Sequence, residues 1–233
     1  MKKILFSVIA LSMGMMAMAA ETAYVQIKLT GVTGQQTNSV YLTEDDAYTS
    51  AYEAGADAEK IMSLANSKSV LMYARVADIF CGDVVTNQLD GLKLGFTTNQ
   101  VDTDYKLTFI NVSGRPLKLF DRVAGQLIDI TDNGEYAFSV DASLVGQKQI
   151  TNRFEIGEPA KSLCFRYNTL EVIGYMGKSL VVKEAATGTE IVNEASLGVV
   201  FSKDLSDKHG RLIVVLDGKE IQIDATPDVT PAN

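Results

Sequence analysis

The 233-residue chain has few of the side chains from which catalytic and metal centres are usually built. It contains one histidine, two cysteines and no tryptophan. The histidine and the cysteines do not supply the four ligands of a tetrahedral zinc site. Ser-His-Asp or Cys-His catalysis needs a histidine beside the nucleophile. The single His209 lies in Asp207-Lys208-His209-Gly210, which is typical of a polar turn between strands, so we expect it at the surface.

The two cysteines, Cys81 and Cys164, stand far apart in the sequence. An oxidising compartment permits a disulfide between them, and closing so long a loop stabilises a fold. Nothing in their spacing favours pairing. We therefore prefer two separate, half-buried thiols that pack as small apolar side chains, with the disulfide as the open alternative.

Basic side chains are also in short supply. The sequence has 21 Lys and Arg against 29 Asp and Glu, a net charge of −8. Nucleic-acid binding relies on clustered Lys and Arg that displace counterions, and anionic membranes attract basic segments. The charge balance therefore argues against both partners. An acidic surface instead favours solubility.

Only one hydrophobic run is long, and it lies at the N-terminus. Lys2 and Lys3 form a basic head, residues 4–16 are largely apolar, and Ala17-Met18-Ala19 has the small-x-small form that signal peptidase cleaves. The run is shorter than the roughly 20 apolar residues that span a bilayer. We expect a signal peptide at 1–19, cleavage between Ala19 and Ala20, and no transmembrane segment after its removal. The protein is then extracellular or at the cell surface, with the periplasm as the alternative.

Long helical patterns are nearly absent from the rest of the chain, where apolar residues alternate with period two. Val25, Ile27 and Leu29 are followed by similar sets at 105–109, 117–119 and 136–140. Residues 70–73 form a continuous apolar run, typical of a central strand covered on both faces. The pattern predicts an all-β fold of two antiparallel β-sandwich modules, of jelly-roll or Ig-like type.

The boundary between the modules is predicted at Gly157-Glu158-Pro159-Ala160, because Pro159 cannot continue a central strand. We expect a larger β-sandwich domain at 22–157, a small Ig-like β-sandwich domain at 160–225 and a flexible tail at 226–233. Turn sequences predict three hairpins in the smaller domain. They lie between Val172-Ile173-Gly174 and 179–182, at Thr187-Gly188 and at Asp217-Gly218.

One segment, 44–64, breaks the alternation and is rich in Ala, Glu and Asp. Gly55 disfavours a single long helix. Asp57 stands where an acidic side chain complements a helix dipole. We therefore predict a largely irregular segment in which 57–62 forms a short helical turn.

Residues 41–156 resemble a module of exported Bacteroidetes proteins, in which an acidic, Gly-containing segment precedes a β-sandwich with an Asp-x-x-x-Gly hairpin, here Asp121 to Gly125. The phrases that carry the resemblance are YLTEDDAYTSAYEAGADAEKIM, VLMYARV, LKLGFTT, YKLTFINVSG, LKLFDRVAGQLIDIT, YAFSV and RFEI. Residues 163–224 are similar to the small sandwich that closes many such proteins, through LEVIGYMGKSLVV, SKDLSDKHGRLIVVLDG and IQIDA. In that family this end module often acts as the sorting signal for type IX secretion, so the resemblance implies the same role here.

Tyr41, Tyr48 and Tyr52 lie in or beside the irregular segment and offer two interpretations. Exposed aromatic rings surrounded by polar groups form platforms for sugars. Buried tyrosines instead bring apolar area and a hydrogen-bonding tip, which would fasten the segment to the sheet. We prefer fastening and keep the platform as a possible ligand site.

The plentiful acids admit two further interpretations. Glu44-Asp45-Asp46, or Asp102 with Asp104, offers oxygen ligands for calcium, although no Asp-x-Asp-x-Asp-Gly loop occurs. Two carboxylates about 5–10 Å apart would serve a glycosidase. Solvated acidic loops account for both sets, so we assign no metal, no cofactor and no catalytic residue.

The sequence thus predicts a non-catalytic secreted or cell-surface protein with a structural or adhesive role. The partner is an unidentified protein or glycan. The leading alternative is a carbohydrate-binding module, and a secreted hydrolase comes third.

Overall fold

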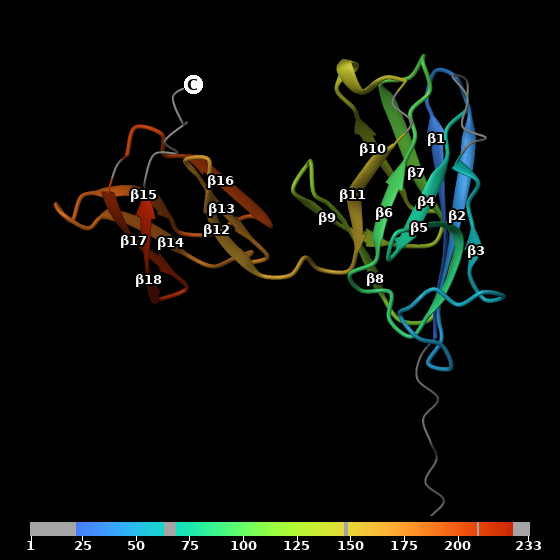
Figure 1. Cartoon of the computed structure of the whole chain (residues 1–233), viewed down its shortest axis with the longest axis horizontal. Coiled ribbons are helices and arrows are strands. Elements are labelled where there is room, and N and C mark those ends of the chain that lie inside the picture. Colours follow the sequence, from blue (N-terminus) through green and yellow to red (C-terminus); the bar gives the residue numbers. More distant parts are fainter. Residues whose placement is uncertain (1–21, 63–68, 147–148, 209, 226–233) are drawn as a thin grey trace, which may run out of the picture.

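The computed structural model describes residues 22–62, 69–146, 149–208 and 210–225. Its regular elements are β-strands, joined by turns and by the short 3₁₀ helix η2 (Ala142–Leu144) (Figure 1). The predicted all-β class is confirmed. Within the described ranges, no helix is both long enough and apolar enough to cross a membrane.

The larger of the sheets takes up every strand before residue 157, in the order β10-β7-β1-β2-β5-β4-β6-β11-β8-β9, with β3 added beside β5. All neighbours are antiparallel except β2 and β5, which run parallel. The strands are β1 (Ala23–Gly31), β2 (Thr37–Glu44), β3 (Ala58–Glu59), β4 (Met72–Val76), β5 (Ile79–Thr86), β6 (Lys93–Phe96), β7 (Asp104–Ser113), β8 (Leu117–Asp121), β9 (Gln126–Ile130), β10 (Glu135–Ser139) and β11 (Ile150–Ile156).

Strand β1 shows how the alternation in the sequence builds this sheet. Its burial alternates along all nine residues, with Val25, Ile27 and Leu29 fully buried. The neighbouring β2 and β7 bring Leu42 and Phe109 to the same core. Each such side chain contributes about 1.5–3 kcal/mol when it leaves water. The apolar face of β1 is therefore the face that turns toward the core.

The run 70–73 is covered on both faces, as predicted. Met72 and Tyr73 point to opposite sides of β4, yet both are fully buried, and β4 lies between β5 and β6. The ring of Tyr73 covers Gly95, where a side chain would collide with it. A central strand therefore reads as a continuous apolar run because neither face meets water.

The ends of the large sheet curl toward each other, so that it is nearly closed into a barrel. Side chains of β10 reach β8 and β11, which stand at the other end of the strand order: Tyr136 bonds Asp121, and Phe138 packs edge-on against Phe154 with ring centres 5.1 Å apart. These strands thus form one mixed sheet rather than the antiparallel two-layer arrangement that was predicted. Alternation identifies the inward residues, but one curled sheet buries them as well as two flat ones do.

The helical turn predicted at 57–62 is wrong. Ala58 and Glu59 form β3, which pairs with β5, while the segment before it consists of turns and bends. The Asp57 carboxylate accepts hydrogen bonds from the backbone N–H groups of Glu53 and Val85, so it ties the segment to β5 instead of capping a helix. Tertiary contacts have overridden a weak local preference.

Lys60 continues this attachment of the irregular segment. Its ammonium group donates to Asn38 Oδ1 at 2.5 Å and to the carbonyl oxygens of Ser39 and Met72, each at 2.8 Å. The stem of Lys60 lies across Gly82. Burial lowers the pKa of Lys60 to about 8.

The strands after residue 160 form two antiparallel sheets over a second hydrophobic cluster. One sheet has the order β12-β13-β16 and the other β15-β14-β17-β18. The strands are β12 (Ser162–Arg166), β13 (Thr169–Ile173), β14 (Leu180–Glu184), β15 (Glu190–Glu194), β16 (Val200–Asp204), β17 (Gly210–Leu216) and β18 (Lys219–Ala225).

Two of the three predicted hairpins in this part are confirmed. Asp217 and Gly218 both have positive φ, 50° and 76°, and join β17 to β18, as a two-residue turn with left-handed central residues requires. Thr187-Gly188 likewise joins β14 to β15. The hairpin at Val172-Ile173-Gly174 is wrong, because β13 and β14 belong to different sheets. A turn signal does not say whether the chain folds back beside itself or crosses to the other layer.

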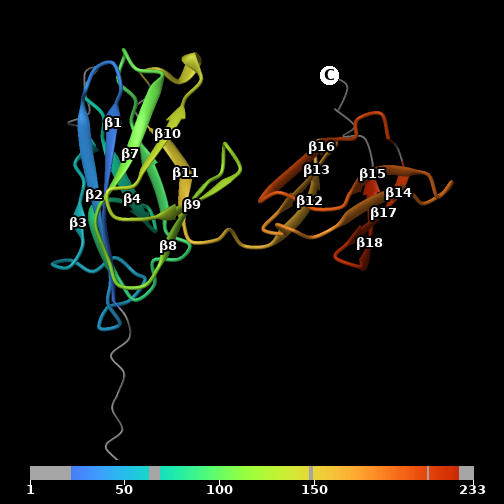
Figure 2. The same cartoon turned by 180° about the vertical axis from the view of Figure 1, so that it is seen from behind.

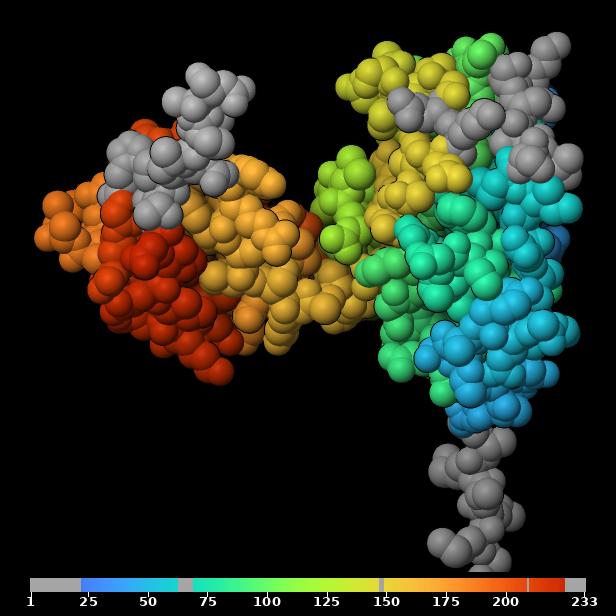
Figure 3. All heavy atoms as spheres, in the orientation of Figure 1, coloured from blue at the N-terminus to red at the C-terminus, as the bar shows by residue number. Residues whose placement is uncertain are grey.

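The two hydrophobic clusters share no residue: one draws on residues 23–156 and the other on 170–216. Figures 2 and 3 show the two groups of strands as two masses, connected through the chain around Pro159, and the turn between β8 and β9 lies against the second mass, with Gly125 beside Val200. Cys81 is buried in the first group and Cys164 is half-buried in the second, and both are free thiols. Burial raises the pKa of the Cys81 thiol to about 11, and the charges of Asp57 and Glu59 add to the effect.

Candidate functional site

The structure places the residues singled out in the sequence in different surroundings. Ala19, Ala20 and His209 lie outside the described residues. Tyr41 stands on β2 with 39% of its surface exposed, whereas Tyr52 is half-buried against the core of the large sheet. Tyr48 is half-buried in the turns between β2 and β3. The three tyrosines therefore occupy different surroundings, and only Tyr41 lies on a strand.

The acidic clusters are engaged by neighbouring protein groups. Glu44 receives two hydrogen bonds from the Arg115 guanidinium, both at 2.6 Å, and one from the Leu89 N–H. The bonds from Arg115 lower the pKa of Glu44 despite its burial. Among the described residues, no group of three or more His, Cys, Asp or Glu side chains is placed to hold a metal ion.

Asp102 fastens two loops at one end of the large sheet. Burial opposes its charge, but hydrogen bonds from Asn99 Nδ2 and from the N–H groups of Gly34 and Thr33 outweigh that effect and lower its pKa. The bond from Asn99 is 2.6 Å long and that from Gly34 is 2.9 Å long. This carboxylate therefore joins the turn after β1 to the loop before β7.

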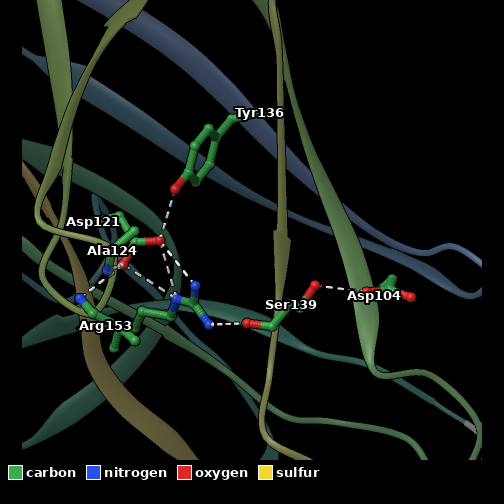
Figure 4. A network of polar contacts seen from close by, with 7 residues as sticks. Asp104, Asp121, Ala124, Tyr136, Ser139 and Arg153 are labelled. Carbon is green, nitrogen blue, oxygen red and sulfur yellow. Dashed lines mark hydrogen bonds and ion pairs between the residues drawn. The ribbon is translucent and has the colours of Figure 1, made fainter.

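The most deeply buried charged pair is Asp121 with Arg153 (Figure 4). Asp121 ends β8 and accepts hydrogen bonds from the N–H groups of Val123 and Ala124, so it closes the Asp-Arg-Val-Ala-Gly turn noted in the sequence. Arg153 on β11 reaches Asp121 Oδ2 at 2.9 Å, and the Tyr136 hydroxyl donates to the same oxygen at 3.0 Å. The sequence motif is thus a turn whose acid also pairs across the sheet.

The same network joins the ends of the curled sheet. Arg153 Nη1 donates to the Ser139 carbonyl on β10 at 2.8 Å, and its guanidinium lies 4.3 Å from the centre of the Phe138 ring. Burial raises the pKa of Tyr136 to about 12, with the charge of Asp121 adding to the effect. Every group is committed to another part of the sheet, so this cluster serves structure and offers no open site.

Strands β7, β1 and β2 lie side by side (Figure 2). A second set of polar residues lies on their side opposite the core. Where Val25, Ile27 and Leu29 point inward, the intervening residues point out. We call this set the outer face; it comprises Tyr24, Gln26, Lys28 and Thr30 of β1, Thr37, Ser39 and Tyr41 of β2, and Lys106 and Thr108 of β7. The strand register places Lys28 beside Ser39 and Thr108, and Tyr41 beside Gln26.

The outer face has a shallow depression of about 690 Å³ at one end, lined by lysine, threonine and glutamate side chains with Val32 and Gln35 from the turn after β1. Lys106 forms an ion pair with Glu135 of β10 at 2.7 Å. Lys28 makes no ion pair and no side-chain hydrogen bond with any part of the chain that the structure describes. The depression therefore offers one uncommitted ammonium group and several hydroxyls.

The other end of the outer face carries two tyrosines. Burial raises the pKa of Tyr24, and the nearby Tyr41 and the charge of Asp83 add to the effect. Asp83 of β5 lies beside Tyr41 of β2, so the rings and the carboxylate lie near one another on this side of the sheet. Aromatic rings flanked by hydroxyl, amide and carboxylate groups are suited to sugars.

A smaller hollow of about 250 Å³ lies between the irregular segment and the β4–β5 turn. Its cations are Arg75 and Lys93, which are already paired with Asp78 and Glu155. A ligand would have to displace those partners, so the outer face is the stronger candidate.

Sequence reasoning missed Tyr24, Lys28 and Lys106. Their signal was present in the polar positions between the inward residues of β1 and β7. The pairing of β1 with β7 was not predictable from the sequence, because a long stretch of chain separates the two strands. Without that register, the three residues do not form a surface.

No family model matches the chain, and comparison with curated proteins and with solved structures found no match either. Its fold defines its class: an all-β chain with a large curled sheet and a polar outer face.

Proposed function

We propose that this chain is an exported, non-catalytic protein with a structural or adhesive role outside the cell. The observation that supports this proposal is that the buried ionisable groups are engaged in contacts within the fold. Asp121 with Arg153, and Glu44 with Arg115, bind each other and the surrounding backbone, so these charges serve the fold. A hydrolase needs titratable groups that meet in a place substrate can reach.

Export is supported by the basic head, apolar run and small-x-small site of residues 1–19. The sequence phrases at 41–156 and 163–224 that resemble exported Bacteroidetes β-sandwich proteins favour the same proposal. They also support reading the part from 160 to 225 as an Ig-like sandwich that serves as a type IX sorting signal. The two layers over one apolar cluster agree with such a module.

Fractionation of producing cells, with mass spectrometry of both ends of the protein, tests this proposal. We expect Ala20 at the N-terminus and the protein outside the cytoplasm. A surface form lacking the last module would support the sorting role, and full-length protein held in the periplasm would remove it. A protein that still begins at Met1 would contradict export by this leader.

A second candidate function is binding to a glycan, and the outer face favours it. Tyr24 and Tyr41 stand near each other beside a carboxylate, on a surface rich in hydroxyls. A glycan array with the purified chain tests it: Tyr41→Ala should remove the signal. The matched control is Tyr167→Ala, which changes a tyrosine that is 84% exposed at a hairpin tip of the other part. Equal loss in both variants would contradict a site on the outer face.

A further inference from the structure

We propose that the outer face binds an acidic polysaccharide, with Lys28 and Lys106 holding the carboxylate or sulfate groups of its sugars. This inference rests on the second candidate function, glycan binding, and gives that function its ligand class. It is carried by three features of the depression: the spacing of the lysines, the state of their charges and the hydroxyls around them.

The strand register brings the two lysines together. Lys28 pairs with Thr108 across β1 and β7, and Thr30 pairs with Lys106. The lysines are therefore diagonal neighbours on one face of an antiparallel pair, about 7–8 Å apart at the backbone. Their long stems let both ammonium groups reach one anionic group that lies between them.

The charges are available for a ligand. Lys28 has no partner among the described residues, and its ammonium group has three donors. Within the described ranges Lys106 is bound to Glu135 alone, and both side chains of that pair are exposed, 38% and 53%. An exposed ion pair is worth about 0–1 kcal/mol. A ligand anion can therefore share Lys106 with Glu135 or replace Glu135 as its partner.

The remaining groups favour a polysaccharide over other polyanions. Thr30, Thr37, Ser39 and Thr108 surround the lysines with hydroxyls that both donate and accept hydrogen bonds, as sugar hydroxyls do. From Tyr24 to Thr30 the face extends about 20 Å along β1, which gives room for several sugar units between the rings and the lysines. Nucleic-acid binding relies on many basic contacts, and the depression supplies two lysines.

The test uses the full exported chain with two acidic polymers and their neutral forms. Polygalacturonate is compared with its methyl ester, and dextran sulfate with dextran, at low and at physiological ionic strength. The carboxylate and sulfate arms distinguish the two sources of negative charge. We expect at least one acidic polymer to bind, its neutral form to bind at least tenfold more weakly, and salt to weaken the binding.

Variants locate the site. Lys28→Gln should weaken binding of the acidic polymer about tenfold, a change of about 1.4 kcal/mol, and the double variant with Lys106→Gln should abolish it. Lys219→Gln is the matched control, because it removes the same charge from an exposed strand lysine on β18. All variants should keep the urea midpoint of the native chain, so that lost binding is not lost folding.

The outcomes separate the inference from the functions it builds on. Equal effects of Lys28→Gln and Lys219→Gln would overturn it. So would binding of neutral glycans that requires Tyr41 but ignores both lysines, although glycan binding itself would then stand. If no polysaccharide binds, the ligand class and glycan binding both fail, while the structural role is still judged by fractionation.

Discussion

The two parts of this chain enclose their cores by different means. The large sheet holds all the buried polar and charged side chains of the described residues, from Glu44 to Glu155. The part after residue 160 has an apolar cluster, and its ion pairs are half-buried, as Lys208 with Glu184, or exposed, as Arg211 with Asp224. The difference follows from geometry, because two regular antiparallel sheets bury few unpaired polar groups between them. A single sheet that curls nearly shut and carries an irregular segment needs polar contacts where its strands end.

The largest expected effect tests those contacts directly. Asp121→Asn leaves Arg153 buried without its counter-charge, so the free energy of unfolding of the large sheet should fall by about 3–5 kcal/mol. Urea unfolding measures it. Arg211→Ala breaks an exposed ion pair of the smaller part. It should leave the urea midpoint of that part unchanged. Similar losses in both variants would refute the contrast.

Replacing an inward ring tests whether the two cores are independent. Phe109 is 1% exposed, and Phe109→Ala should cost about 3–5 kcal/mol through lost burial and the cavity left behind. The unfolding transition of the smaller part should not move, because its cluster shares no residue with that core. A loss below about 1 kcal/mol would place Phe109 at the surface.

Two Tyr→Phe variants test how much the stability of the large sheet depends on the hydrogen bonds of its buried hydroxyl groups. Tyr136→Phe removes a hydrogen bond to the Asp121 carboxylate and should cost about 1.5–3 kcal/mol. Tyr73 is fully buried, and its hydroxyl has no hydrogen-bond partner in the described parts of the chain. Tyr73→Phe should therefore leave stability unchanged or raise it by up to about 1 kcal/mol. Equal losses in the two variants would mean that the hydroxyls contribute alike.

Acid should destabilise the large sheet first, by a smaller amount. The folded pKa of Glu44 lies below its ordinary value of 4.5 because Arg115 bonds the charged form. The unfolded chain thus binds more protons below that value, and stability is lost as pH falls through 4.5 and below. Thermal unfolding at stepped pH should show this loss in the transition of the large sheet. Glu44→Gln should reduce the slope, and an unchanged slope would count against the assignment.

Much of the local structure was predictable, because it depends on nearest neighbours. The inward face of β1 followed from Val25, Ile27 and Leu29, and the last hairpin followed from Asp217-Gly218. The segment around Asp57 was not predictable in the same way. Its acid suited a helix end as well as it suited a bond to the Val85 N–H, and only contact with β5 decided between them.

The candidate site was likewise predictable only in part: residue type was informative, but strand pairing was not. Tyr41 was singled out by its type and its irregular surroundings, but its neighbours Gln26 and Asp83 come from strands that precede and follow it in the chain. The link between Lys28 and Lys106 likewise depends on β1 pairing with β7. Such pairings join residues far apart in sequence, where alternation carries no information about partners.

The sequence by itself determined that this chain is all-β and which residues of each strand point inward, because burying an apolar side chain is favourable whatever strand lies beside it. The tertiary structure alone decided that the first eleven strands form one mixed sheet, with Arg153 and Asp121 where its ends meet and with lysines and tyrosines gathered on one outer face. Those features depend on the order and register of strands, and these result from the packing of the whole sheet rather than from any one segment.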